Sequence, residues 1–107
     1  MIKLTHDAVV ARQRLGEELV AVARQTERVP VVVAAEAVAA EDDPTSAMVY
    51  LHLQDDDCIG GLPLAHQIKL PRPLDEHELA ELARGFIPRI SSEVICEAIT
   101  TRIVGLH

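Results

Sequence analysis

A chain of 107 residues is long enough for one domain with one hydrophobic core, so residues 1–107 are treated as a single domain. Hydrophobic residues make up 49% of the sequence, but Tyr50 and Phe86 are its only Phe, Tyr or Trp side chains, so aliphatic residues and alanine must build the core. The formal charge of −7 opposes attraction to phosphate backbones and anionic lipid, which argues against nucleic-acid and membrane partners.

The cysteine count and the N-terminal sequence indicate the cellular compartment of the protein. Cys58 and Cys96 are too few for a disulfide framework or a four-cysteine zinc site. The N-terminus reaches charged residues at once, and no apolar run approaches the length of a membrane span. We therefore expect a cytoplasmic protein with reduced thiols.

The first predicted element is an N-terminal helix that follows Thr5. Its apolar residues recur every three or four positions, which is the spacing of one helix face. They are Ala8, Ala11, Leu15, Leu19, Val22 and Ala23. The helix should end before Pro30, because proline disfavours helical backbone at the residue that precedes it.

Three strands are predicted next. Residues 30–40 combine a run of valines with several alanines, so a strand is favoured and a helix is the alternative. Residues 47–54 and 62–70 are rich in strand-forming residues. The loop between them contains Gly60 and Gly61, as a chain reversal requires.

Two helices are predicted after the strands. Asp75 and Glu78 have the spacing of a capping box, and that helix should end at Gly85. A second helix is expected from Ser91 to Ile103. The predicted fold class is α+β, with an N-terminal helix, a three-stranded antiparallel meander and two C-terminal helices. If residues 30–40 are helical instead, the fold is mostly α with one β-hairpin.

The middle strand is apolar on both faces, which suggests an oligomer. Helices can cover one face of a sheet, and the other face then needs another helix or a second subunit. An alanine-rich core also buries little apolar area per residue, so we expect a homo-oligomer. The residues assigned to its interface are Val49, Leu51 and Leu53.

Acidic residues gather in two predicted turns, and such clusters can steer basic partners at long range. We therefore expect a small non-enzymatic protein-binding or regulatory module, such as an accessory subunit, an antitoxin- or immunity-type protein, or an inhibitor. The residues predicted to contact its basic protein partner are Asp42, Asp43, Asp55, Asp56 and Asp57. No catalytic or cofactor-binding residues are assigned, and an enzyme is the less favoured class.

A metal site is the first alternative. If the second hairpin turns near Ile59, His52 lies opposite His66, close to Asp57 and Cys58. Such a mixed ligand set suits a divalent transition metal, as in a small metal-dependent enzyme or a metal sensor. The prediction depends on the register, since a slip of one residue turns one histidine to the other face.

A transcriptional regulator is the second alternative. Residues 75–104 have the spacing of a helix-turn-helix unit. The helix that would read DNA carries Glu93 and Glu97, where basic or amide side chains are needed. Two packed helices of a small core are therefore the favoured interpretation of this segment.

Overall fold

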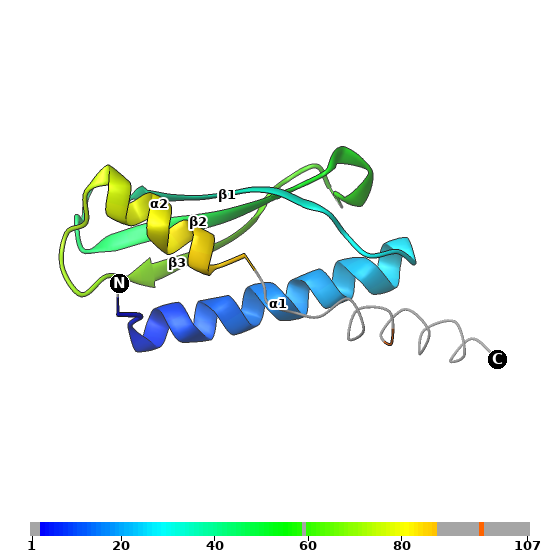
Figure 1. Ribbon diagram of the computed structural model, residues 1–107, viewed down its shortest axis with the longest axis horizontal. Helices are drawn as coiled ribbons and strands as arrows, with labels where there is room; N and C mark the ends of the chain where they lie inside the picture. Colours follow the sequence, from blue (N-terminus) through cyan, green and yellow to red (C-terminus); the bar gives the residue numbers. More distant parts are fainter. Residues whose placement is uncertain (1–2, 59, 88–96, 98–107) are drawn as a thin grey trace.

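The computed structural model describes residues 3–58, 60–87 and 97, and these form an α+β arrangement (Figure 1). The elements are α1 (His6–Thr26), β1 (Val32–Ala39), β2 (Ser46–Leu53), the short 3-10 helix η1 (Asp55–Asp57), β3 (Leu64–Lys69) and α2 (Glu76–Gly85). The strands form an antiparallel sheet in the order β1-β2-β3. The predicted meander is thereby confirmed, and the alternative of a single hairpin is wrong. Apart from Glu97, which is helical, the helix predicted from Ser91 onward lies outside the described residues.

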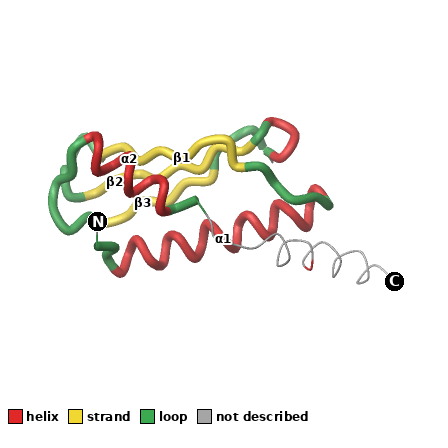
Figure 2. The backbone as a smooth tube through the Cα atoms, in the orientation of Figure 1, coloured by secondary structure: helices red, strands yellow, loops and turns green. Residues whose placement is uncertain are grey.

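Both helices pack on the same face of the sheet, so the described chain has two layers (Figure 2). α1 lies against β3, and α2 lies against β1. One shared core cluster joins the helices to the alternate side chains of β2. Its members include Leu15, Leu19, Leu79, Leu82 and Phe86 from or beside the helices, and Ala47, Val49, Leu51 and Leu53 from β2. The opposite face of β2 carries Met48, Tyr50 and His52, which are only half-buried.

Local signals in the sequence fix both helix starts. The Thr5 hydroxyl accepts a hydrogen bond from the Ala8 N–H at 3.2 Å, so it caps α1, and it donates to the Lys69 carbonyl at 2.7 Å. The capping box before α2 is confirmed, because the Glu78 N–H donates to Asp75 Oδ1 at 2.8 Å and the Asp75 N–H donates to Glu78 Oε1 at 3.3 Å. α1 ends before Pro30, as predicted. Neither α1 nor α2 is long and apolar enough to span a membrane.

The register of the second hairpin differs from the predicted one. His66 pairs with Val49 rather than with His52, and Ile68 pairs with Ala47. The predicted register would have turned Ile68 toward the open face of the sheet, whereas the observed one buries it in the core. Because side chains alternate between faces, this odd shift also places His52 and His66 on opposite faces.

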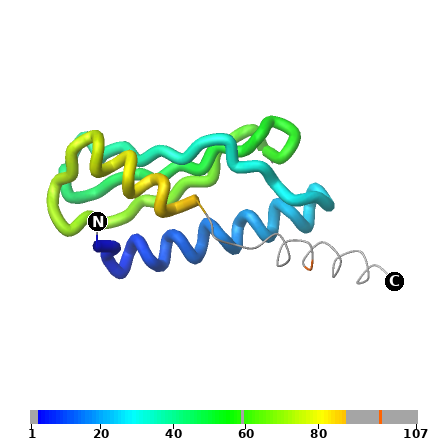
Figure 3. Tube along the Cα trace, in the orientation of Figure 1, coloured from blue at the N-terminus to red at the C-terminus, as the bar shows by residue number. Residues whose placement is uncertain are grey.

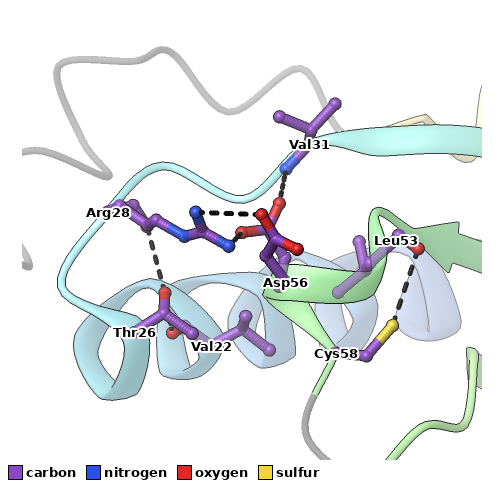
Figure 4. A network of polar contacts seen from close by, with 8 residues as sticks. Val22, Thr26, Arg28, Val31, Leu53, Asp56 and Cys58 are labelled. Carbon is purple, nitrogen blue, oxygen red and sulfur yellow. Dashed lines mark hydrogen bonds and ion pairs between the residues drawn. The ribbon is translucent and has the colours of Figure 1, made fainter.

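Asp57 connects the loop after β2 to the α1–β1 connection through its contacts with Arg28 and Val31. Figure 4 shows Arg28, Val31 and the neighbouring Asp56. The Asp57 side chain is 2% exposed, its Oδ2 accepts a hydrogen bond from the Val31 N–H at 2.7 Å, and its Oδ1 lies 2.5 Å from Arg28 Nη2. The neighbouring Asp56 is 68% exposed and lies 3.7 Å from Arg28. Asp57 therefore joins two loops that are far apart in the sequence.

Asp43 plays a similar part in the turn between β1 and β2. Its Oδ1 accepts hydrogen bonds from the Thr45 N–H at 3.0 Å and the Thr45 hydroxyl at 2.7 Å, and its Oδ2 accepts one from the Ser46 hydroxyl at 3.0 Å. Lys69 Nζ lies 3.4 Å from the same carboxylate. These donors, those of Thr45 first, hold the pKa of Asp43 well below its ordinary value of 3.8.

Replacing Asp57 should destabilise the fold. Asp57→Ala leaves the Val31 N–H without its acceptor and Arg28 without its buried counter-charge. We expect a loss of about 2–3 kcal/mol in the free energy of unfolding, since Arg28 is itself partly solvated. Urea unfolding followed by circular dichroism measures this loss. Asp56→Ala is the matched control and should change stability by less than about 0.5 kcal/mol. Equal effects of the two substitutions would contradict the assigned role.

Asp43 should make the fold sensitive to acid. Because its pKa is lower in the folded state than in the unfolded state, its contribution to stability is present above about pH 4 and is lost as the pH falls further. Asp43→Asn should therefore be less stable than the native chain at pH 7, and the difference should shrink below pH 4. Urea midpoints measured from pH 7 to pH 2 test this. A difference that stays constant over that range would contradict the assignment.

Candidate protein-binding edge

The residues of the predicted metal site are not brought together. His52 lies on the open face, with Nε2 2.9 Å from Glu36 Oε1, whereas His66 faces α1, with Nε2 3.1 Å from Glu18 Oε1. Asp57 is occupied by Arg28 and Val31, and the Cys58 thiol donates to the Leu53 carbonyl at 3.5 Å. Within residues 3–58, 60–87 and 97, no group of three or more His, Cys, Asp or Glu could hold a metal ion.

The two acidic clusters lie at opposite ends of the sheet (Figure 3). Successive turns of an antiparallel meander fall at alternate ends, so the turn that contains Asp42 is remote from the loop that contains Asp55 and Asp56. Asp43 and Asp57 are held by the internal contacts given above. Of the five predicted partner-binding carboxylates, Asp42, Asp55 and Asp56 are exposed, and they do not form one surface.

The residues predicted to form an oligomer interface lie inside the core. Val49 and Leu51 are 0% exposed and Leu53 is 6% exposed. They pack against the two helices of the same chain, so their burial needs no second subunit. An oligomer of this chain must therefore use other residues.

The outer edge of β1 carries main-chain groups that β2 does not use. The Ala40 N–H donates to the Ser46 carbonyl at 2.9 Å. In an antiparallel pair, the main-chain N–H and C=O groups of successive residues point alternately toward and away from the neighbouring strand, so those of Val38 and Glu36 also point toward β2. The main-chain groups of Ala35, Ala37 and Ala39 consequently point away from β2. Among the described residues, no strand pairs with this edge.

The other edge of the sheet, on β3, is less available. The Leu70 N–H donates to the Thr45 carbonyl at 2.7 Å, and the same alternation directs the groups of Ala65, Gln67 and Lys69 outward. The Lys69 carbonyl is already bonded to the Thr5 hydroxyl. A lysine at an edge also discourages strand pairing, so β1 is the more receptive edge.

A groove of about 580 Å³ runs between β1 and α2. Residues 35–39 line it on the strand side, and Glu76, Leu79, Ala80 and Arg84 line it on the helix side. Glu76, Ala80 and Arg84 are exposed, and neither charged residue makes an ion pair with another described residue. The groove therefore has a strand wall whose one charged residue is Glu36, and a helix wall whose two charged residues have no ion pair among the described residues.

Sequence reasoning missed this groove because its two walls are about forty positions apart in the chain. Whether a strand lies at the edge of a sheet is set by the topology, which a single sequence does not show. The sequence held one indication of an unprotected edge strand, because Glu36 is the only charged residue of β1. Glu76 and Arg84 are also two helical turns apart, so both lie on one face of α2.

In comparisons with known proteins, no family model, no curated protein and no solved structure matched this chain.

Proposed function

We propose that this chain is a non-enzymatic protein-binding module that adds an extended segment of a partner protein to β1 as a further strand. The observation that carries the proposal is the open edge formed by the main-chain groups of Ala35, Ala37 and Ala39. An added strand gains affinity from main-chain hydrogen bonds and specificity from pockets that take its alternate side chains. The groove beside α2 supplies such a pocket.

β1 lacks most of the features that protect an edge strand. Natural edges are short or carry lysine, proline or a bulge. β1 is eight residues long, contains no lysine or proline, and has its one irregularity between Val32 and Ala34, at its start. Val33 and Val38 are 59% and 49% exposed. The regular part, residues 35–39, is therefore suited to pairing with another strand.

The charge of the chain favours a basic partner. The net charge of −7 and the exposed Asp42, Asp55 and Asp56 would raise the association rate of a positively charged protein, most strongly at low salt. These carboxylates would attract the partner, and the edge would bind it. In this proposal the protein works in the cytoplasm, where the free Cys58 stays reduced.

Blocking the β1 edge should abolish strand addition. Decapeptides selected from a random phage-displayed library against the full chain serve as the probe, and their affinities are measured by calorimetry at low protein concentration. Ala37→Pro removes an outward N–H without removing a bond to β2, so the fold should persist while peptide affinity falls at least about tenfold. Circular dichroism checks that the variant is folded.

Gln67→Pro provides the matched control, because it removes an outward N–H from the opposite edge of the sheet. This variant should bind the selected peptides as the native chain does. Failure to select any peptide, or equal affinity for the native chain and folded Ala37→Pro, would contradict the proposed function.

A further inference from the structure

We infer that one occupant of the β1 edge is a second copy of this chain, whose β1 pairs antiparallel with the first across a two-fold axis to give one continuous six-stranded sheet. The inference rests on the proposed function, because it names a second occupant of the same edge, besides the basic protein. The observation behind the inference is that the groove is self-complementary. Its strand wall can pair with a second copy of itself, and its helix wall carries one negative and one positive side chain that can face each other across the two copies.

Two copies of the strand wall can pair in a register that joins their outward-pointing main-chain groups. Residues 35–39 are centred on Ala37. A two-fold axis at Ala37 pairs it with Ala37 of the partner subunit, and pairs Ala35 with Ala39 of the partner subunit. All of these residues carry outward main-chain groups, so each can form the two hydrogen bonds of an antiparallel pair.

This register also separates the one charge on the strand from its symmetry mate. With the axis at Ala37, Glu36 lies opposite Val38 of the partner subunit. With the axis at Glu36, the two Glu36 carboxylates would lie directly opposite each other, and such like-charge pairs are destabilising. The small side chains of Ala35 and Ala37 also leave the core-facing side of the new junction uncrowded.

The helix wall is self-complementary about Ala80. Glu76 and Arg84 are equally distant from Ala80 in the sequence, one toward each end of α2. The same two-fold axis makes the two α2 helices antiparallel, which brings Arg84 toward Glu76 of the partner subunit and repeats the contact by symmetry. Both charged groups lack an ion pair with any other described residue, so they are available for this contact.

Sedimentation equilibrium of the full chain over a range of concentrations tests the inference. The native chain should fit a monomer–dimer equilibrium, and folded Ala37→Pro should stay monomeric. Arg84→Glu places like charges together and should raise the dimer dissociation constant about tenfold or more. The double variant Glu76→Arg with Arg84→Glu restores opposite charges and should return the constant to within about threefold of the native value.

Glu81→Arg is the control on the same helix, because Glu81 is exposed and does not line the groove. It should dimerise at least as well as the native chain. A native chain that stays monomeric at every concentration would overturn the inference, as would a dimer that is unaffected by both Ala37→Pro and Arg84→Glu. Selected peptides that still bind such a chain, with Ala37→Pro abolishing their binding, would leave the proposed function intact.

Discussion

β2 is the strand on which the rest of the described chain depends, because it alone has a neighbouring strand on each side. Its alternate side chains must be buried, and both helices cover them on one face only. That single requirement fixes the register of β3, since Ile68 and Leu64 must face the same helices. Among the described residues, it also leaves one edge of β1, beside α2, without a neighbouring strand. The candidate binding edge is therefore a direct consequence of how the core is closed.

Local patterns in the sequence predicted much of this fold. The apolar spacing of α1, its cap at Thr5, and the capping box at Asp75 and Glu78 all act within one or two helical turns, and each is confirmed. The three strands were also found from composition and turn residues. These signals succeed because their interacting groups are close in the sequence.

The predicted register failed because it depends on a distant constraint. Placing His52 opposite His66 considered only the hairpin and its loop. The observed pairing is set by packing of Ile68 against helices elsewhere in the chain, and by the anchoring of Asp57 to Arg28 and Val31. Neither contact is visible as a local motif. The predicted metal site is therefore wrong, because the tertiary packing places His66 on the opposite face of the sheet from His52.

The acidic residues also show that a local sequence pattern does not reveal which side chains are exposed. Asp55, Asp56 and Asp57 are consecutive and chemically alike, yet one is buried as a structural anchor and the other two are exposed. Asp42 is exposed, whereas Asp43 is partly buried and held by Thr45. The sequence shows a run of negative charge, and only the path of the backbone decides which carboxylates remain available to a partner.

Residue-resolved amide hydrogen exchange in β1, measured by NMR on the full chain at several concentrations, tests the central claim that its outer edge is open for pairing. In dilute solution, the amides of Glu36 and Val38 should be protected by their bonds to β2, and those of Ala35 and Ala37 should exchange quickly. As the protein is concentrated, Ala35 and Ala37 should gain protection. If Ala35 and Ala37 were as strongly protected as Glu36 and Val38 at every concentration, the edge would already be filled within the monomer, which would contradict the account.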